Sequence, residues 1–181
     1  MAVTKPYIIF AKYNAESNER IIGIMKKLTN DEREKDRGSF YGSLSGLVRH
    51  ILGGTYFFAG MFTKTLAGNA AALDALAVIT AVPRAPEGAL SETGWKELTA
   101  SLDTVDRGYI ALIEALQDGD LDAPVEISWY GGKPASVPLD FMLQQLVSHN
   151  IHHRGQISQI LDELNIDNDY SMINAAFLPN G

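Results

Sequence analysis

The sequence has no cysteine among its 181 residues. Disulfide bonds, thiolate metal sites and a cysteine nucleophile are therefore excluded, and imidazole and carboxylate groups remain as the strong metal ligands. Long hydrophobic runs are also lacking near the start of the chain, because residues 1–10 contain only the short apolar run Tyr7–Phe10. Such a run is too short for a membrane span or for the core of a signal peptide. We therefore expect a complete cytoplasmic protein with no membrane partner.

Positive charge is scarce as well. Lysine and arginine total 15 against 22 aspartate and glutamate residues, which gives a formal net charge of −7. A surface of this sign repels phosphate backbones, and the chain has neither a basic run nor a helix-turn-helix pattern, so nucleic acid is not expected as a partner. Apolar residues make up 46% of the chain. This is enough for one hydrophobic core, and we expect residues 1–181 to form a single domain.

Four segments carry apolar residues at three- and four-residue steps, the spacing that places them on one face of a helix. The segments cover residues 5–28, 39–66, 91–116 and 138–164. In the second segment the expected buried face consists of Phe40, Leu44, Leu47, Ile51, Phe58 and Met61. We expect a charged connection at 29–38 and a loop rich in proline and glycine at 82–94. From residue 165 onward we expect an irregular tail that folds back on the body.

The period changes between the third and fourth segments. Val125, Ile127 and Trp129 alternate with polar residues, and Gly131-Gly132 supplies a turn before a second short strand at 135–137. This pattern predicts a small β-hairpin. The sequence as a whole therefore predicts an all-α fold, a four-helix bundle with a short β-hairpin before the last helix.

Three of the four histidines lie in the last of these helices. His149 and His153 are four residues apart, so they are separated by about 40° around the helix axis and one turn along it, and their imidazoles can reach a common point. His152 lies about 100° from His153 and cannot easily join them. We expect the pair to face the bundle interior, because it falls on the stripe that contains Leu146 and Ile157.

The fourth histidine, His50, lies in the second helix on a line with Gly54 and Phe57 that we expect to face inward. Gly54, one turn away, is expected to leave room for an ion or a ligand. Three inward histidines on two helices are consistent with a metal site of three nitrogen ligands and one open position. The alternative is that each histidine is a neutral core residue that donates one hydrogen bond. The convergence of three histidines favours the metal site over that alternative.

These residues also match a known family. His149 to Ile157 is similar to an H-x-x-x-H-R-G-Q signature, Leu47 to Ile51 resembles a histidine-bearing stretch of a second helix, and Gly132 to Pro134 with Val137 to Leu139 looks like a hairpin that leads into a last helix. With these passages the sequence resembles the DinB/YfiT-like family of metal-binding helical bundles. Their order and spacing agree over nearly the whole chain.

The resemblance implies an up-down-down-up four-helix bundle, often a homodimer, with a divalent zinc or nickel ion held by His50, His149 and His153. Gly155 is then expected to permit close helix packing, and Arg154 and Gln156 to hydrogen-bond neighbouring helices or the dimer partner. We expect a partner subunit to contact the first helix and the glycine-rich face of the second. The opening Tyr13-Asn14 and Asn18 also resemble the family's first helix, but we assign them no function.

The resemblance further implies a metal-dependent enzyme of the thiol S-transferase or isomerase type, in which the open metal position binds a low-molecular-weight thiol and lowers its pKa. A metal-dependent hydrolase is an alternative that the same ligands permit. Asn150 stands where metalloproteases with an H-E-x-x-H motif carry glutamate, which disfavours ordinary metalloprotease chemistry.

The other functional class is a non-enzymatic, damage-inducible stress-response protein in which the metal only ties two helices together. Structural zinc sites usually take all four ligands from the protein, so an open site tilts the balance toward catalysis. Neither Asp140 nor Asp162 lies on the His149/His153 line, and we expect neither to be a fourth ligand. DNA binding ranks last. At this point both enzyme and non-enzymatic functions stay open.

Overall fold

The computed structural model describes residues 4–128, 132–173 and 177. The chain is mostly helical in this part, as the sequence predicts. Its α-helices are α1 (Lys5–Met25), α2 (Asn30–Glu34), α3 (Leu44–Thr65), α4 (Ala70–Ala81), α5 (Glu92–Ala115) and α6 (Leu139–Glu163). None of these helices is long and apolar enough to cross a membrane.

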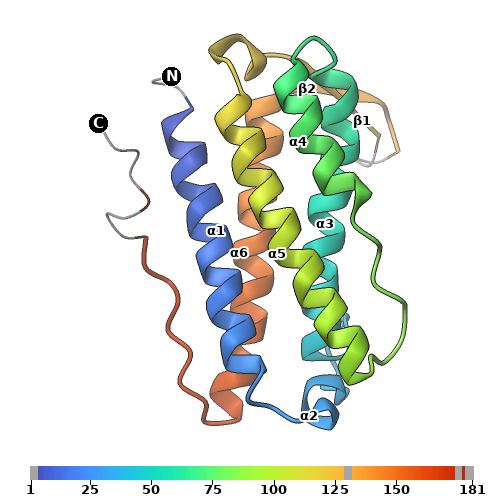
Figure 1. Ribbon diagram of the computed structural model, residues 1–181, viewed down its shortest axis with the longest axis vertical. Helices are drawn as coiled ribbons and strands as arrows, with labels where there is room; N and C mark the ends of the chain where they lie inside the picture. The colour runs from blue at the N-terminus through green and yellow to red at the C-terminus, as the bar shows by residue number, and fades with distance from the viewer. Residues whose placement is uncertain (1–3, 129–131, 174–176, 178–181) are drawn as a thin grey trace.

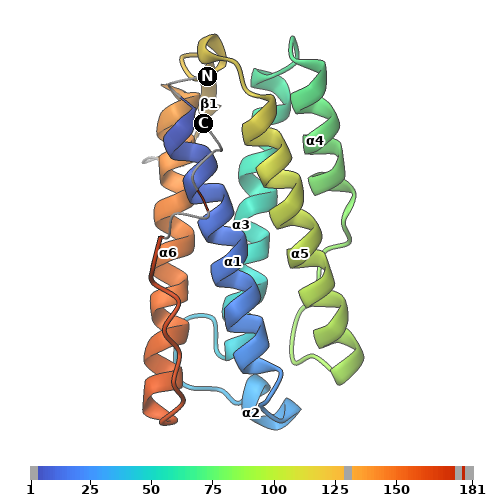
Figure 2. The same ribbon diagram turned by 60° about the vertical axis from the view of Figure 1, so that its left-hand side comes forward.

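The four long helices α1, α3, α5 and α6 lie side by side and form a bundle (Figures 1 and 2). Helices α1 and α6 run in one direction, and α3 and α5 run in the other, so the order is up-down-down-up (Figure 1). Each helix buries an apolar stripe, represented by Ile21, Leu47, Val105 and Ile157, in one shared core. The predicted four-helix bundle is therefore confirmed.

Side-chain caps fix where the helices begin. The Ser43 hydroxyl accepts a hydrogen bond from the Gly46 amide at 3.1 Å, and the Ser91 hydroxyl accepts one from the Gly94 amide at 3.2 Å. Caps of this kind satisfy amide groups that have no partner within the helix. Helix α3 consequently begins at Leu44, five residues later than the sequence pattern suggests.

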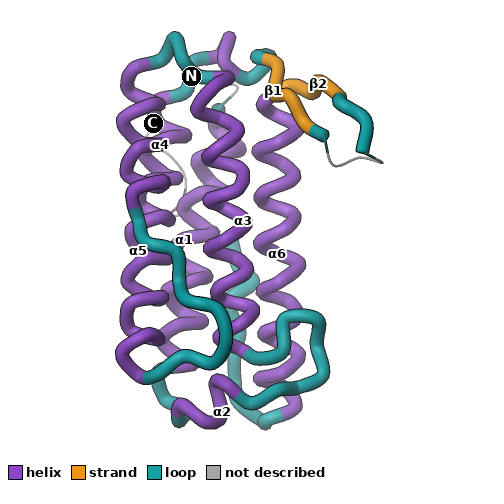
Figure 3. The backbone as a smooth tube through the Cα atoms, turned by 90° about the vertical axis from the view of Figure 1, so that its right-hand side faces the viewer, coloured by secondary structure: helices purple, strands orange, loops and turns teal. Residues whose placement is uncertain are grey.

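The short hairpin precedes α6, as predicted. Strands β1 (Pro124–Ile127) and β2 (Ala135–Pro138) pair antiparallel, with Val125 opposite Val137. The hairpin lies at the end of the bundle where α6 begins (Figure 3). The alternation of apolar and polar residues correctly placed a strand at Val125 and Ile127, and both of these side chains are buried. The expected positions of Trp129 and Gly131 lie outside the described residues.

Two parts of the prediction are wrong. Phe40 was expected on the buried face of the second helix, but it is 93% exposed, because residues 39–42 form a turn with a Ser39–Gly42 bridge before the helix begins. The helix α4 was not predicted at all. Its sequence is apolar almost all round, so no stripe marks it, and it packs outside the bundle against α5 (Figure 2). The charged connection also contains one short helix, α2.

The described residues that directly follow α6, up to residue 173, fold back on the body, as expected. The Tyr170 side chain is buried, and its hydroxyl donates to the Arg154 carbonyl oxygen at 2.8 Å. The Ser17 hydroxyl on α1 donates to the Tyr170 carbonyl oxygen at 3.3 Å. Residues 165–173 thus lie along the seam between α1 and α6 (Figure 2).

Candidate metal centre

The structure brings the three predicted histidines together. His50 comes from α3, and His149 and His153 come from α6, which packs antiparallel to α3. One ring nitrogen from each of the three lies within 4.8 Å of the other two. The ring centroids are 4.3 to 4.8 Å apart. We call these three residues the histidine cluster; His152, as predicted, is exposed and does not belong to it.

In His149 and His153 the Nδ1 atom forms a hydrogen bond to a neighbouring amide, and this bond determines which ring nitrogen faces the centre of the cluster. The His153 Nδ1 lies 2.7 Å from the Gln156 Oε1, and the His149 Nδ1 lies 3.2 Å from the Asn150 Oδ1. With each amide oriented in this way, the oxygen accepts the Nδ1 proton, so Nε2 keeps its lone pair. Fixing the tautomer through the second ring nitrogen is typical of metal-binding histidines.

The closest approach within the cluster is 2.9 Å, between the Nε2 atoms of His149 and His50. Two unprotonated nitrogens at this distance repel each other, and they need either a proton on one of them or a cation between them. Tetrahedral bonds from one zinc ion to two imidazoles, each about 2.0–2.1 Å long, place the two nitrogens about 3.3–3.4 Å apart, so a shift of about 0.4 Å would admit the ion. The spacing and the donor set therefore fit a divalent metal ion.

Burial keeps the three imidazoles in the neutral form that binds metals. Desolvation, with repulsion from His153 and His149, lowers the pKa of His50 to about 4. Desolvation also lowers the pKa of His149 and the pKa of His153, although their amide partners act in the opposite direction. At neutral pH the rings therefore carry lone pairs, and no proton has to leave before a cation binds.

Gly54 is required by this arrangement, but not in the way that the sequence suggested. A Cβ atom at position 54 would lie 2.4 Å from the His149 Cε1 and 3.0 Å from its Nδ1. The imidazole of His149 therefore lies in the space left by the missing side chain, and Gly54 also lines the cavity beside the cluster. The close approach of α3 to α6 at Gly54 is what allows His149 to reach His50.

Tyr41, which the sequence analysis did not single out, covers one side of the cluster. Its ring stacks on His50, with centroids 3.8 Å apart and planes inclined by 24°, and its edge meets His153 at 5.2 Å. Tyr41 lies in the turn before α3, where no periodic pattern or motif marks it. Its stacking fixes the plane of the His50 ring.

The other side of the cluster opens into a cavity of about 380 Å³. Its lining residues come from α3 and α6 and are His50, Gly53, Gly54, Phe57, Phe58, Gln145 and His149. Phe57 was expected to face inward, but 54% of the residue is exposed. His50 and His149 are half-buried. The predicted inward orientation of the histidines is therefore only partly correct, because the cluster faces a seam that is open to solvent.

No carboxylate belongs to the group of ligand atoms in residues 4–128, 132–173 and 177. Asp140 and Asp162, which the sequence analysis set aside, are not in it. The described part of the chain thus offers three neutral nitrogen ligands and no fourth one. A donor set of this kind leaves a coordination position for water or for a small molecule.

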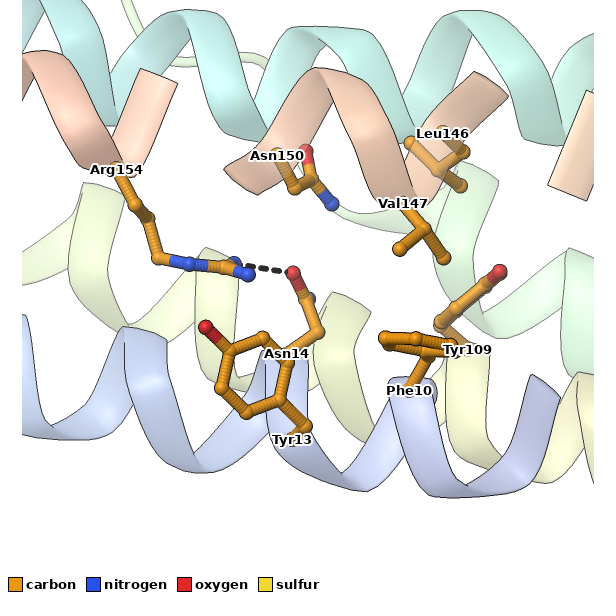
Figure 4. A pocket seen from close by; sticks show the side chains of 8 residues that line it. All are labelled: Phe10, Tyr13, Asn14, Tyr109, Leu146, Val147, Asn150 and Arg154. Carbon is orange, nitrogen blue, oxygen red and sulfur yellow. Dashed lines mark hydrogen bonds between the residues drawn. The ribbon is translucent and has the colours of Figure 1, made fainter. Parts of the chain in front are cut away.

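A second polar cluster lies directly beside the first. The Arg154 guanidinium donates to the side-chain oxygens of Asn14 and Asn18, and the amide groups of both asparagines donate to the Asp106 carboxylate at 2.9 to 3.2 Å. Figure 4 shows Arg154 reaching Asn14 beside the ring of Tyr13. All four members are buried. We call Arg154, Asn14, Asn18 and Asp106 the arginine network.

The contacts of the arginine network and of its neighbours on α6 bear on several expectations from the sequence. Asn14 and Asn18, to which no function was assigned, tie α1 to α5 and α6. Arg154 bonds a neighbouring helix, as expected, whereas Gln156 bonds His153 on its own helix. Gly155 is exposed, with no atom within 4 Å of a Cβ built on it, so it does not permit close packing within the chain.

Comparisons with known proteins agree with this architecture. A family model described as "DinB family" matches residues 1–165. Among solved structures, the chain is similar to a DinB-like protein, YjoA from Bacillus subtilis, with 19% identity, a TM-score of 0.57, and coverage of 87% of this chain and 93% of that one. At this identity the structural likeness shows the fold alone. A search of curated proteins found no match.

Proposed function

The chain belongs to the DinB family, and from this premise we propose that it binds one divalent metal ion, zinc or nickel, through His50, His149 and His153. The observation that carries the proposal is the convergence of one ring nitrogen from each of the three histidines within 4.8 Å of the other two, with no acidic group among them in the described residues. The amide partners of His149 and His153 support it, because they turn the lone pairs of both rings toward the centre.

We further propose that the metal serves an enzyme of the thiol S-transferase or isomerase type that uses a low-molecular-weight thiol. A bound divalent ion lowers the pKa of a coordinated thiol, so that thiolate forms near neutral pH. The chain's own contribution is to hold three neutral donors on two rigid helices and to leave one side of them open to a cavity. The absence of cysteine leaves no thiol of its own to compete.

The alternatives have less support. Hydrolysis by a metal-bound water needs a general base nearby, and Asn150 stands where metalloproteases with an H-E-x-x-H motif carry their glutamate base. A non-enzymatic stress-response protein that uses the metal only as a tie between α3 and α6 would be expected to supply a fourth ligand. The cavity beside His50 and His149 would have no role in such a protein.

The test is metal content, measured by inductively coupled plasma mass spectrometry on untagged protein purified without chelator. We expect about one zinc or nickel ion per wild-type chain, and loss of that ion from His50→Ala and from His153→Ala. His152→Ala is the matched control, because it removes an exposed histidine next to the cluster. Wild-type protein that stays metal-free after incubation with zinc and with nickel would overturn the proposal.

We also propose that the protein is cytoplasmic and that it is a homodimer, as the family resemblance implies, in which the partner contacts α1 and the exposed glycine side of α3. Gly53 and Gly60 on this helix are exposed and have nothing within 4 Å of a Cβ position, so a second chain can approach closely. Light scattering after size exclusion should give twice the mass of the chain, and the mass of a single chain would refute the dimer.

A further inference from the structure

The side chain of Tyr41 contacts the histidine cluster from outside the two helices that carry it. Its ring lies over His50 of α3, with centroids 3.8 Å apart and planes inclined by 24°. The same ring meets His153 of α6 at a centroid distance of 5.2 Å, with the two planes perpendicular. Because α3 begins only at Leu44, Tyr41 belongs to the preceding turn. A residue of that turn thus contacts ligand histidines on both helices.

The three imidazoles are held by two different kinds of contact. In His149 and His153 a neighbouring amide oxygen holds the Nδ1 atom. The ring nitrogens of His50 have one partner in the described part of the chain, the Nε2 of His149, and the stack on Tyr41 supports this ring in place of an amide. Metal ligands need such support, because a ring that turns freely about its side-chain torsions seldom has the geometry that binds.

The stack becomes stronger when the His50 ring gains positive charge, as an imidazole does on binding a divalent ion. The face of an aromatic ring is negative, and the rings of Tyr41 and His50 are close to parallel. The Tyr41 face therefore attracts the His50 ring more strongly in the metal-bound state. Such a difference between the two states raises metal affinity, whereas support that is equal in both states would change stability alone.

Glycines shape the turn that carries Tyr41. Gly38 and Gly42 have φ values of +70° and +71°, in a region of backbone conformation that favours glycine. The Gly42 amide donates to the Ser39 carbonyl oxygen at 2.9 Å, and the Ser43 amide donates to the Tyr41 carbonyl oxygen at 2.9 Å. These bonds fix the position of Tyr41 ahead of α3.

Gly46 allows this turn to lie against the start of α3. A Cβ atom at position 46 would lie 2.0 Å from the Tyr41 carbonyl oxygen and 3.1 Å from its carbonyl carbon. Both are backbone atoms, so the turn would have to move. Gly94 occupies the same place in α5, because its amide bonds to the capping Ser91 as the Gly46 amide bonds to Ser43. A Cβ atom at position 94 would come no closer than 3.4 Å to a neighbouring atom.

We propose that Tyr41 is a positioning residue of the metal centre, whose stacked ring holds His50 in its binding orientation and raises metal affinity, and that Gly46 gives the Tyr41 backbone the room this requires. The inference rests on the proposed function, because the ion is the one proposed for His50, His149 and His153. Tyr41 acts through His50 and is assigned no bond to the metal.

The first experiment measures zinc affinity of the full-length protein by competition with a zinc indicator, and each metal-free variant is also unfolded with urea. Tyr41→Ala should weaken zinc binding at least about tenfold. Tyr41→Phe keeps the ring and should stay within about twofold of wild type. Phe40→Ala is the control, because it removes an adjacent ring that is 93% exposed, and it should also stay within about twofold.

The glycine pair tests the backbone part of the inference. Gly46→Ala should weaken zinc binding about as much as Tyr41→Ala, because its methyl group displaces the turn. Gly94→Ala changes the corresponding position of another helix without such a clash and should leave zinc affinity within about twofold of wild type.

Proton NMR of the metal-free protein tests the stack independently of any metal. The carbon-bound ring protons of His50 are identified by their loss in His50→Ala. The face of the Tyr41 ring shields them, because they lie beneath it in the stack. They should therefore move downfield in Tyr41→Ala and keep their positions in Tyr41→Phe.

The outcomes separate the role of Tyr41 from the metal site itself. If wild type and Tyr41→Ala bind zinc equally, or if Tyr41→Phe is as weak as Tyr41→Ala, the positioning role is overturned and the metal proposal stands. A Tyr41→Ala protein that loses stability while the His50 resonances stay in place would also overturn it. If wild type binds no zinc, the proposed function fails, and the role of Tyr41 in metal affinity fails with it.

Discussion

Two polar clusters meet on α6, where His153 belongs to the histidine cluster and the next residue, Arg154, belongs to the arginine network. In the arginine network every charge has a partner within the chain, because two asparagines accept from Arg154 and donate to Asp106. In the histidine cluster the Nε2 atoms of His50 and His149 face each other with no acidic group beside them in the described residues. The first cluster pairs its charged groups within the chain, although the Arg154 Nε has no hydrogen-bond partner among the described residues. The second requires a cation or a proton between its nitrogens.

This difference distinguishes a structural polar cluster from a ligand-binding one more clearly than burial or residue type does. A polar cluster that satisfies itself holds helices in register and has no need of a ligand. A cluster whose donors all point at one another, next to a cavity, is arranged for something that the chain does not supply. The comparison predicts that changes in the arginine network reduce stability, whereas changes in the histidine cluster reduce metal binding.

The largest expected effect is on stability. Asp106→Ala removes the acceptor of both Asn14 and Asn18 and the carboxylate that faces Arg154. We expect a loss of about 3–5 kcal/mol in the free energy of unfolding, measured by urea denaturation of the metal-free protein. Asp103→Ala is the control on the same helix, because its ion pair with Arg107 is exposed and should contribute less than about 1 kcal/mol.

The distinction between the two clusters would be contradicted if the Asp106→Ala protein that remains folded had lost its metal. We expect it to keep about one ion per chain, because Asp106 lies outside the group of ligand atoms.

The next largest effect is a difference in metal binding between substitutions at two adjacent glycines. Gly54→Ala should displace His149 and strongly weaken metal binding, because the new Cβ would lie 2.4 Å from the His149 Cε1. Overpacking of this kind also costs about 1–3 kcal/mol of stability. Gly53→Ala meets no atom within 4 Å and should stabilise the helix by about 0.5–1 kcal/mol with metal binding unchanged. Calorimetric zinc titration of both variants checks the contrast, and equal zinc affinity in the two would contradict it.

A smaller effect is expected from the partner of His153. Gln156→Ala removes the oxygen that holds the Nδ1 of His153 at 2.7 Å, and it should weaken metal binding by about 10- to 100-fold while stability changes little. Gln159→Ala is the control, because Gln159 is exposed and bonds only to Glu163 among the contacts seen. The role assigned to Gln156 is refuted if a competition assay with a zinc indicator gives the same affinity for both variants.

The smallest effect is a pH dependence of stability in the arginine network. Burial raises the pKa of Asp106 from 3.8 to about 7, against the opposing effects of Asn18, Arg154 and Asn14 and with a small contribution from Asp103 in the same direction. The folded state therefore keeps a proton that the unfolded chain releases. This stabilisation is complete below pH 3.8 and is lost as the pH rises through 7.

For the metal-free protein we expect the contribution of Asp106 to fall by about 1 kcal/mol between pH 6 and pH 8, measured by urea denaturation. The matched variant is Asp106→Asn, which cannot ionise and should lack this part of the slope. An identical slope in the two proteins would show that Asp106 does not titrate in this range.

The sequence predicts those parts of the molecule in which apolar residues or histidines recur at regular spacing. The long amphipathic helices and the hairpin follow from apolar spacing, and the four-residue step between His149 and His153 places two rings on one side of α6. Helix α4 leaves no such trace, because a segment that is apolar all round has no distinct buried face. Phe40 was misplaced because the helix begins only after the Ser43 cap.

The features that depend on tertiary contacts could not be predicted from the sequence. The stacking of Tyr41 on His50 joins a turn to a helix, and the link from Asn18 to Asp106 spans 88 residues. Neither pair has a spacing that local structure would reveal. Gly54 was singled out as a residue that leaves room for an ion or a ligand, but only the packed helices show that His149 occupies the space beside it.

The central claim is that three neutral imidazoles hold one divalent ion and leave a position open. Zinc K-edge X-ray absorption on the zinc-loaded protein tests it most directly. We predict a first shell of three imidazole nitrogens at about 2.0–2.1 Å and one further light atom that is replaced by sulfur when phenylmethanethiol is added. A shell with fewer than three imidazoles, or one that stays unchanged when the thiol is added, would contradict the account.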